Sequence, residues 1–107
     1  MNFSFDGYKI LSEKKLQKSI KNNLPQEYKE VFDEKLKYLA KNPSHPSLNT
    51  KPFGVSKKTL RDLGVSEVWE FYINRKEYRC IFYVSHQDKA IIIAYVGNHQ
   101  QLKNKYS

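Results

Sequence analysis

The sequence has little of several things on which protein chemistry often depends. Cys80 is the only cysteine among 107 residues, so no internal disulfide can form, and its place in the apolar run 78–84 predicts a buried thiol. The four glycines are not spaced as a phosphate-binding loop. His45, His86 and His99 lack the spacing of metal ligands. These absences argue against nucleotide-driven and metal-dependent chemistry, and we expect neither a cofactor nor a metal.

Long apolar segments are missing as well. No stretch approaches the roughly 18 apolar residues that a membrane-spanning helix needs. The N-terminal segment lacks a basic stretch followed by a long apolar core, which a secretion signal would show. We therefore expect neither secretion nor membrane insertion. A single cysteine fits a reducing cytoplasm.

Acidic residues are outnumbered by basic ones. Nineteen Lys and Arg stand against 11 Asp and Glu, which gives a formal net charge of +8. This surplus attracts polyanions, so nucleic acid is the leading partner class and an acidic protein is the other. Apolar residues make up 39% of the chain and aromatic residues 14%, which is enough for a core. The length predicts one domain over residues 1–107.

The first half of the chain has mainly helical periodicity. Residues 3–11 read as a short edge strand, interrupted by a turn. Ser12 could cap a first helix that ends near residues 22–23, and a second helix spans residues 25–42 with apolar side chains at three- and four-residue spacing. An irregular connection follows, and then a short helical turn that ends at Gly64.

The second half switches to a period of two, which is typical of strands. Three strands are predicted at 68–73, 78–84 and 90–96, and their short polar connections favour an antiparallel meander of two hairpins. The tail from Gly97 shows no strong element. The predicted fold class is α+β, with two N-terminal helices packed on a small antiparallel sheet in the order β-α-α-β-β-β.

Alternation along the strands assigns the two faces of this sheet. The apolar face should meet the helices; its members are Trp69, Phe71, Ile73, Tyr78, Cys80, Phe82 and Val84. The opposite face gathers Glu70, Tyr72, Arg79 and Tyr83. An arginine within an apolar strand needs a partner for its charge. A cross-strand ion pair with Glu70 and a functional cation are equally good explanations.

The side chains of this face suit RNA cleavage without a metal. That reaction needs a base for the 2′-hydroxyl proton, a cation at the transition state, and an acid for the departing 5′ oxygen. Arg79 could supply the cation, and Glu70 or His99 could move the protons. Aromatic rings on which bases could stack are those of Tyr72, Tyr83 and Tyr106. Taken alone, His99 would more often be a surface histidine and Tyr106 a tail residue.

Four segments carry a more specific signal. They are N-P-S-H-P-S-L at 42–48, W-E-F-Y-I at 69–73, N-R-K-E-Y-R-C-I-F-Y at 74–83 and I-I-I-A-Y-V-G-N-H at 91–99. Their order and spacing after two helices resemble the RelE/ParE superfamily of bacterial type II toxins, over nearly the whole chain. The resemblance implies one of two activities: toxins of the RelE branch cut messenger RNA on the ribosome, and those of the ParE branch poison DNA gyrase.

The resemblance also implies site residues. Arg79 matches the strand arginine that contacts the scissile phosphate, His99 matches a basic residue after the last strand, and Tyr106 lies near a terminal catalytic tyrosine. Glu70 and Tyr72 stand where RelE has basic residues, a mixture closer to the HigB, YafQ and YoeB branches. We expect Arg79 to stabilise the phosphate, His99 to act as general acid or base, and Glu70 to accept a proton or to orient its neighbours.

Charged residues outside this face complete the expectation. Those that would hold the RNA backbone are Lys51, Lys57, Lys58, Arg75 and Lys76. A cognate antitoxin with an acidic or amphipathic segment would cover the basic face. The leading hypothesis is a ribosome-dependent, metal-independent endoribonuclease. The alternative is a gyrase poison or a catalytically inactive, toxin-like binding protein.

Overall fold

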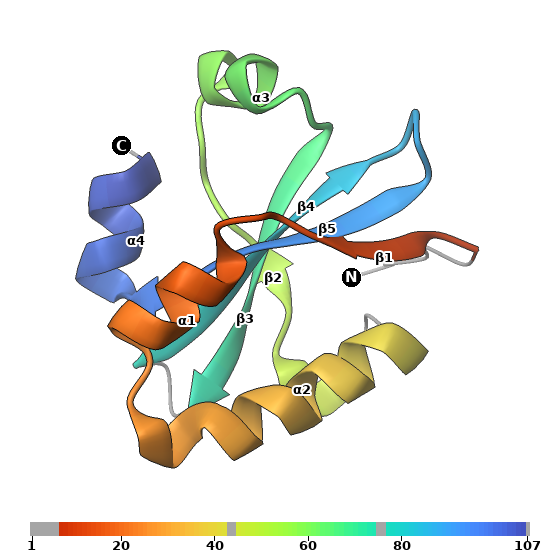
Figure 1. The fold of residues 1–107 in the computed structure, drawn as a ribbon. Helices are drawn as coiled ribbons and strands as arrows, with labels where there is room; N and C mark the ends of the chain where they lie inside the picture. The colour runs from red at the N-terminus through yellow and green to blue at the C-terminus, as the bar shows by residue number, and fades with distance from the viewer. Residues whose placement is uncertain (1–6, 43–44, 75–76, 107) are drawn as a thin grey trace.

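A computed structural model describes residues 7–42, 45–74 and 77–106. These residues form one mixed sheet in the strand order β1-β5-β4-β3-β2, with helices on both faces (Figure 1). The strands are β1 (Lys9–Ser12), β2 (Lys51–Pro52), β3 (Glu67–Asn74), β4 (Tyr78–Ser85) and β5 (Ala90–Asn98). The α-helices are α1 (Leu16–Asn23), α2 (Lys29–Lys41), α3 (Lys57–Leu63) and α4 (His99–Tyr106). No helix in these three ranges is long and apolar enough to cross a membrane.

The predicted antiparallel meander is confirmed. Strands β3, β4 and β5 pair in sequence order, with Trp69 opposite Phe82 and Cys80 opposite Val96. Each strand is at most two residues longer at either end than the sequence pattern predicted. The predicted end of the second helix is also confirmed, because α2 finishes at Lys41, after a 3-10 turn at Gln26–Tyr28.

The prediction was wrong in three respects: the direction of one strand, the role of Ser12 and the order of the elements. The sheet is mixed because β1 runs parallel to β5, a pairing that needs the long helical crossover between them. Ser12 ends β1, and it does not cap α1. The observed order is β-α-α-β-α-β-β-β-α, because β2 and α3 precede the meander and the tail forms α4. Residues 3–6 of the predicted first strand lie outside the described residues.

The turn predicted to end at Gly64 is the helix α3. The Ser56 hydroxyl at its N-cap accepts a hydrogen bond from the Thr59 N–H at 3.1 Å. Gly64 ends the helix with φ of 71°, a left-handed conformation that glycine adopts without steric cost. These two caps explain how a helix of only seven residues forms here.

The face predicted to be apolar packs against α1 and α2. Leu16 of α1 and Phe32 and Leu39 of α2 join Phe71 and Phe82 of the sheet in one buried cluster. The opposite face is also covered, which the sequence pattern did not predict. Members of that second cluster come from α3, α4 and the sheet, and include Leu60, Leu63, Val68, Ile81, Tyr83, Ala94 and Leu102. The second face is therefore open only where these helices do not reach.

Helix α1 takes the place of a strand along the second half of β5. Strand β1 pairs with β5 only as far as Ile93. Further along, the buried Ser19 hydroxyl accepts a hydrogen bond from the Val96 N–H at 3.1 Å and donates one to the Leu16 carbonyl at 2.8 Å. The Asn23 amide donates to the Val96 carbonyl at 2.8 Å. Side chains of α1 thus satisfy backbone groups that an adjacent strand would otherwise bind.

Ser19→Ala should therefore destabilise the protein more than an ordinary surface change. The substitution leaves the buried Val96 N–H without its partner, and such a loss costs about 1–3 kcal/mol. The free energy of unfolding, measured by urea denaturation, should fall by that amount. Ser12→Ala on the exposed edge strand β1 is the matched control and should change it by less than about 0.5 kcal/mol. Equal losses in the two variants would contradict this role of Ser19.

Candidate functional site

Arg79 and Glu70 form an ion pair on the second face of the sheet. Tyr72 is the cross-strand neighbour of Arg79, so Glu70 lies diagonally opposite it, within reach of a long side chain. The Arg79 Nη1 and Glu70 Oε1 atoms are 3.2 Å apart, and their side chains are only 14% and 4% exposed. The ion pair, one of the two explanations for an arginine in this strand, is therefore present.

Two further side chains complete what we term the Arg79 cluster, made of Lys51, Glu70, Tyr72 and Arg79. The Lys51 ammonium lies 3.8 Å from the same Glu70 oxygen. The Lys51 ammonium and the Arg79 guanidinium each lie 5.0 Å from the centroid of the Tyr72 ring, a distance at which cations interact with aromatic rings. The cluster contains two cations and one carboxylate, so it carries a net positive charge.

A hollow of about 530 Å³ opens beside this cluster. Lys51 and Tyr72 line it, together with Lys35 of α2 and Asn74 at the end of β3. Lys51 is about half exposed there, whereas Glu70 is buried. An anion that enters the hollow would therefore meet the lysine and the tyrosine ring before it meets the carboxylate.

The position of Glu70 favours one of its two predicted roles. Its carboxylate is removed from solvent and held by the two cations of the cluster. A carboxylate in such a place orients the guanidinium that it binds, and it is poorly exposed to take a proton from a substrate. Orientation of Arg79 is the role that this geometry supports.

His99 is the first residue of α4, and a reciprocal cap places it there. Asn98 Oδ1 accepts a hydrogen bond from the Gln101 N–H, and Gln101 Oε1 accepts one from the Asn98 N–H, both at 2.8 Å. This is a capping box, and N-x-x-Q at 98–101 is the sequence signal for α4 that was missed. Gly97, two residues before His99, pairs with Arg79, so Arg79 and His99 lie toward the same end of the sheet.

Gly97 permits this approach of α4 to the sheet. A Cβ atom at this position would lie 3.1 Å from Gln101 and 3.2 Å from the Tyr95 ring. Only a residue without a side chain fits between them without displacement. The His99 side chain is exposed, and it forms no hydrogen bond to the residues that the structure describes. An exposed imidazole at a fixed backbone position is available for proton transfer.

Tyr83 and Tyr106 form a separate pair. Their hydroxyl oxygens are 2.9 Å apart, and the Tyr106 ring also meets the rings of Phe53 and Tyr95 edge to face. Burial is the main cause that raises the pKa of Tyr106, and its hydrogen bond with Tyr83 adds to it. Four residues along β4 separate Tyr83 from Arg79, which corresponds to about 13 Å. The Tyr83–Tyr106 pair is therefore separate from the Arg79 cluster.

Two of the remaining predicted residues are lysines of α3. Lys57 and Lys58 are exposed on α3, where Lys58 pairs with Asp62 at 2.8 Å. Arg75 and Lys76 lie outside the described residues. The thiol of Cys80 is fully buried, as predicted, and burial raises its pKa. Covalent chemistry at this cysteine is therefore excluded by lack of access.

The Tyr83–Tyr106 pair predicts a loss of stability in alkali. The pKa of Tyr106 in the folded chain lies above the unfolded value of about 10, so the unfolded state loses its proton first. The free energy of unfolding should be unaffected by this group below about pH 10 and should fall above it. Tyr106→Phe should make this fall shallower in urea titrations, whereas Ser12→Ala, which removes no titrating group, should leave the slope unchanged. A slope that is the same in all three proteins would contradict the prediction.

No protein-family model matches the sequence, and no curated protein matches it significantly. Solved structures do match the fold. The archaeal RelE–RelB complex from Pyrococcus horikoshii OT3 is 20% identical, with 85% of this chain and 93% of that chain covered and a TM-score of 0.60. The RelB–RelE complex from Methanococcus jannaschii is 14% identical, with 91% of this chain and 99% of that chain covered and a TM-score of 0.65.

A bacterial structure gives the same result. The E. coli DinJ–YafQ toxin–antitoxin complex is 16% identical, with 89% of this chain and 96% of that chain covered and a TM-score of 0.63. The resemblance inferred from the four sequence segments therefore extends to the arrangement of helices and strands. This chain has the fold of the RelE/ParE superfamily of toxins.

Proposed function

We propose that this protein is the toxin of a toxin–antitoxin pair and that it cleaves messenger RNA on the ribosome without a metal. The observation that carries the proposal is the Arg79 cluster. Glu70 holds the Arg79 guanidinium in place, Lys51 and Tyr72 of the cluster line an open hollow, and Arg79 lies at the end of the sheet where His99 begins α4. The RelE, YafQ and YoeB folds to which the chain is similar support the toxin role.

The proposed reaction divides its tasks among these side chains. His99 takes the proton from a 2′-hydroxyl, and the 2′ oxygen forms a bond to phosphorus. Arg79 donates hydrogen bonds to the phosphate oxygens as negative charge develops on them. The bond between phosphorus and the 5′ oxygen breaks, and that oxygen takes a proton from water, which leaves a 2′,3′-cyclic phosphate. His99 then returns its proton to the solvent. Glu70 keeps the guanidinium oriented throughout.

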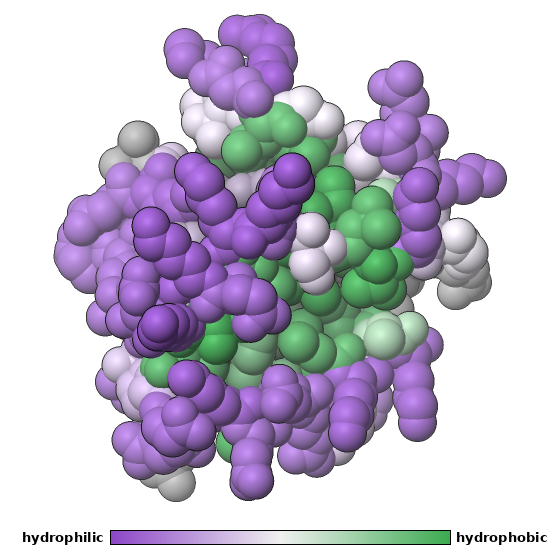
Figure 2. Space-filling view, in the orientation of Figure 1, coloured by the Kyte–Doolittle hydropathy of each residue, from purple (hydrophilic) through white to green (hydrophobic). Residues whose placement is uncertain are grey.

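An antitoxin partner is part of the proposal. Apolar side chains gather between α1, β1 and α2 in Figure 2, and Ile10 of β1, which pairs with Ile91 of the core, is 37% exposed. A groove between α1 and α2 in the same region contains Leu16, Ile20 and Leu36. Apolar grooves of this kind receive amphipathic segments of partner proteins. The RelE and YafQ structures named above are complexes with RelB and DinJ.

One observation favours the alternative of a gyrase poison or an inactive binding protein. Glu70 already forms an ion pair with Arg79, so an RNA phosphate must either bind the guanidinium alongside the carboxylate or displace the carboxylate from it. A buried ion pair of this kind is also a common structural feature that has no catalytic role. The two functions differ in whether messenger RNA is cut, so an experiment that detects cleavage can decide between them.

Mapping of mRNA 5′ ends after induction in a growing bacterium tests the nuclease proposal. The wild-type protein should produce new, codon-phased 5′ ends. His99→Ala should reduce them by about 100-fold, the typical effect of losing a general acid or base. Arg79→Lys keeps the charge but loses the planar fork that binds phosphate, so a reduction of at least about tenfold is expected.

Controls separate catalysis from folding in this experiment. Lys37→Ala changes an exposed lysine on α2 that the described residues do not pair, and it should cleave as the wild type does within about twofold. Circular dichroism of each purified variant shows whether it folds. Intact mRNA together with DNA-damage signalling would contradict the nuclease proposal and favour a gyrase poison. Intact mRNA without any effect on growth would indicate a binding protein.

A further inference from the structure

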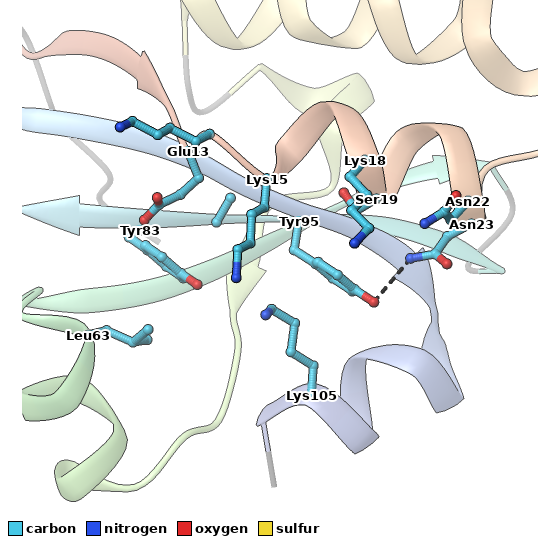
Figure 3. Close-up of a pocket in the computed structure, with 12 residues that line it drawn as sticks. Glu13, Lys15, Lys18, Ser19, Asn22, Asn23, Leu63, Tyr83, Tyr95 and Lys105 are labelled. Carbon is cyan, nitrogen blue, oxygen red and sulfur yellow. Dashed lines mark hydrogen bonds between the residues drawn. The ribbon is translucent and has the colours of Figure 1, made fainter.

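A recess of about 640 Å³ lies over the β5 side of the second face, and no predicted site residue except Tyr83 lines it. Helix α1 and the residues before it form one wall, Leu63 of α3 and Lys105 of α4 form others, and Tyr83, Ala94 and Tyr95 form the floor (Figure 3). We propose that this recess binds the phosphate backbone of single-stranded RNA. The inference rests on the proposed function, because that RNA is the strand cleaved beside Arg79.

Four lysines surround the recess and one carboxylate opposes them. The lysines are Lys14, Lys15, Lys18 and Lys105, and the carboxylate belongs to Glu13. Within the described ranges, none of the four ammonium groups forms an ion pair, in contrast to Lys51 and Lys58. The recess therefore has an excess of positive charge that the fold itself does not neutralise. A ligand with several negative charges would neutralise it.

Three of these lysines lie where a positive charge destabilises the adjacent helix. Lys14, Lys15 and Lys18 lie at the start of α1, which has no acidic residue in its first turn and no side-chain cap. The positive end of a helix dipole repels such cations, and the cations repel one another. Folding gains nothing from this arrangement, so we attribute it to binding.

Lys105 points into the recess from the opposite side. Its ammonium lies 4.9 Å from the centroid of the Tyr95 ring and 5.7 Å from that of Tyr106. Figure 3 shows Lys15 and Lys105 directed toward the space beside the Tyr95 ring. The Tyr95 hydroxyl is itself held by the Asn23 amide at 3.0 Å. Lys105 thus lies against one fixed aromatic ring, and Lys15 is directed toward the same space from the other side.

The lining favours RNA over an acidic peptide. A helix that docks in a groove needs several apolar pockets in a row, and Leu63 and Ala94 are the only aliphatic side chains named in this lining. The groove between α1 and α2 has such side chains, and this recess does not. Lysines bind phosphates as point charges, and a tyrosine ring can contact a base. The chemistry therefore matches a nucleic acid strand.

The position of the recess connects it with the Arg79 cluster. Tyr83 borders the recess and lies on the same face of β4 as Arg79, about 13 Å along the strand. Ile81 lies between Tyr83 and Arg79 on this face and is buried, so RNA held in the recess would pass over the covering helices to reach Arg79. A flexible single strand can follow such a path, whereas a rigid duplex cannot bend into the recess. Binding through phosphates is independent of sequence, so the recess would hold RNA without choosing the cleavage site.

The test measures binding of a fluorescently labelled single-stranded RNA whose 2′-hydroxyls are methylated, so that attack by the 2′ oxygen cannot cut it. The triple variant Lys14→Gln, Lys15→Gln, Lys18→Gln should bind it at least about tenfold more weakly at physiological ionic strength. The slope of log affinity against log salt should become shallower by about 2, as expected for three lost phosphate contacts.

The control removes the same number of charges elsewhere. Lys9, Lys37 and Lys41 are exposed and do not line the recess, so replacing all three with Gln should weaken binding by less than about threefold. Equal weakening by the two triple variants would overturn the proposal, as would unchanged binding in both. A recess that binds a polyglutamate peptide more tightly than this RNA would identify a protein partner and overturn it as well.

The two proposals fail in different ways. If the lysine variant loses RNA binding but the wild-type protein cuts no mRNA, the proposal for the recess holds and the nuclease proposal is wrong. If the wild-type protein cuts mRNA and the lysine variant binds RNA as tightly as the wild type does, the nuclease stands and the recess is wrong. Circular dichroism of both triple variants excludes unfolding as the cause of lost binding.

Discussion

The second half of β5 has a helix beside it instead of a strand, and much of the structure depends on how its backbone polar groups are satisfied. Ser19 and Asn23 bind the N–H and the carbonyl of Val96. Asn23 also donates to the Tyr95 hydroxyl and accepts from the Gln101 amide, at 3.0 and 3.1 Å. One amide side chain therefore ties α1, β5 and α4 together. Buried networks of this kind are effective only when each member has a partner.

The consequences of that network reach both proposed sites. The bond between Gln101 and Asn23 holds the first turn of α4, and the capping box with Asn98 fixes where His99 begins the helix. The far end of α4 carries Lys105 to the wall of the lysine-lined recess and places the Tyr106 ring against that of Tyr95, which is part of its floor. A single helix thus has the proposed proton-transfer residue at one end and a wall of the proposed RNA recess at the other.

The parts of the fold that depend on local patterns could be predicted from the sequence. Alternation identified three strands and their faces, and an arginine in an apolar strand pointed to Glu70 as its partner. The parallel pairing of β1 with β5 could not be predicted, because it joins segments about 80 residues apart without a local signal. Helix α4 was missed because its apolar periodicity is weak, although the N-x-x-Q capping box at 98–101 is visible in the sequence.

The candidate site shows the same division. Residues on one strand face were grouped correctly, and Arg79, Glu70 and Tyr72 do lie together. Sequence reasoning could not separate Tyr83 and Tyr106 from that group, because a helix folded back over the sheet decides which tyrosines are buried. It also did not identify the lysines of α1 as a group with Lys105, since they meet only in the folded chain.

The burial of the single cysteine also has a practical consequence. The Cys80 thiol is inaccessible and its pKa is raised, so alkylating reagents should not react with the folded wild-type chain. Any cysteine introduced at an exposed position would be the one reactive thiol. A fluorophore, spin label or crosslinker could therefore be attached at a chosen surface residue without first removing a native cysteine, and distances within a complex could be measured from it.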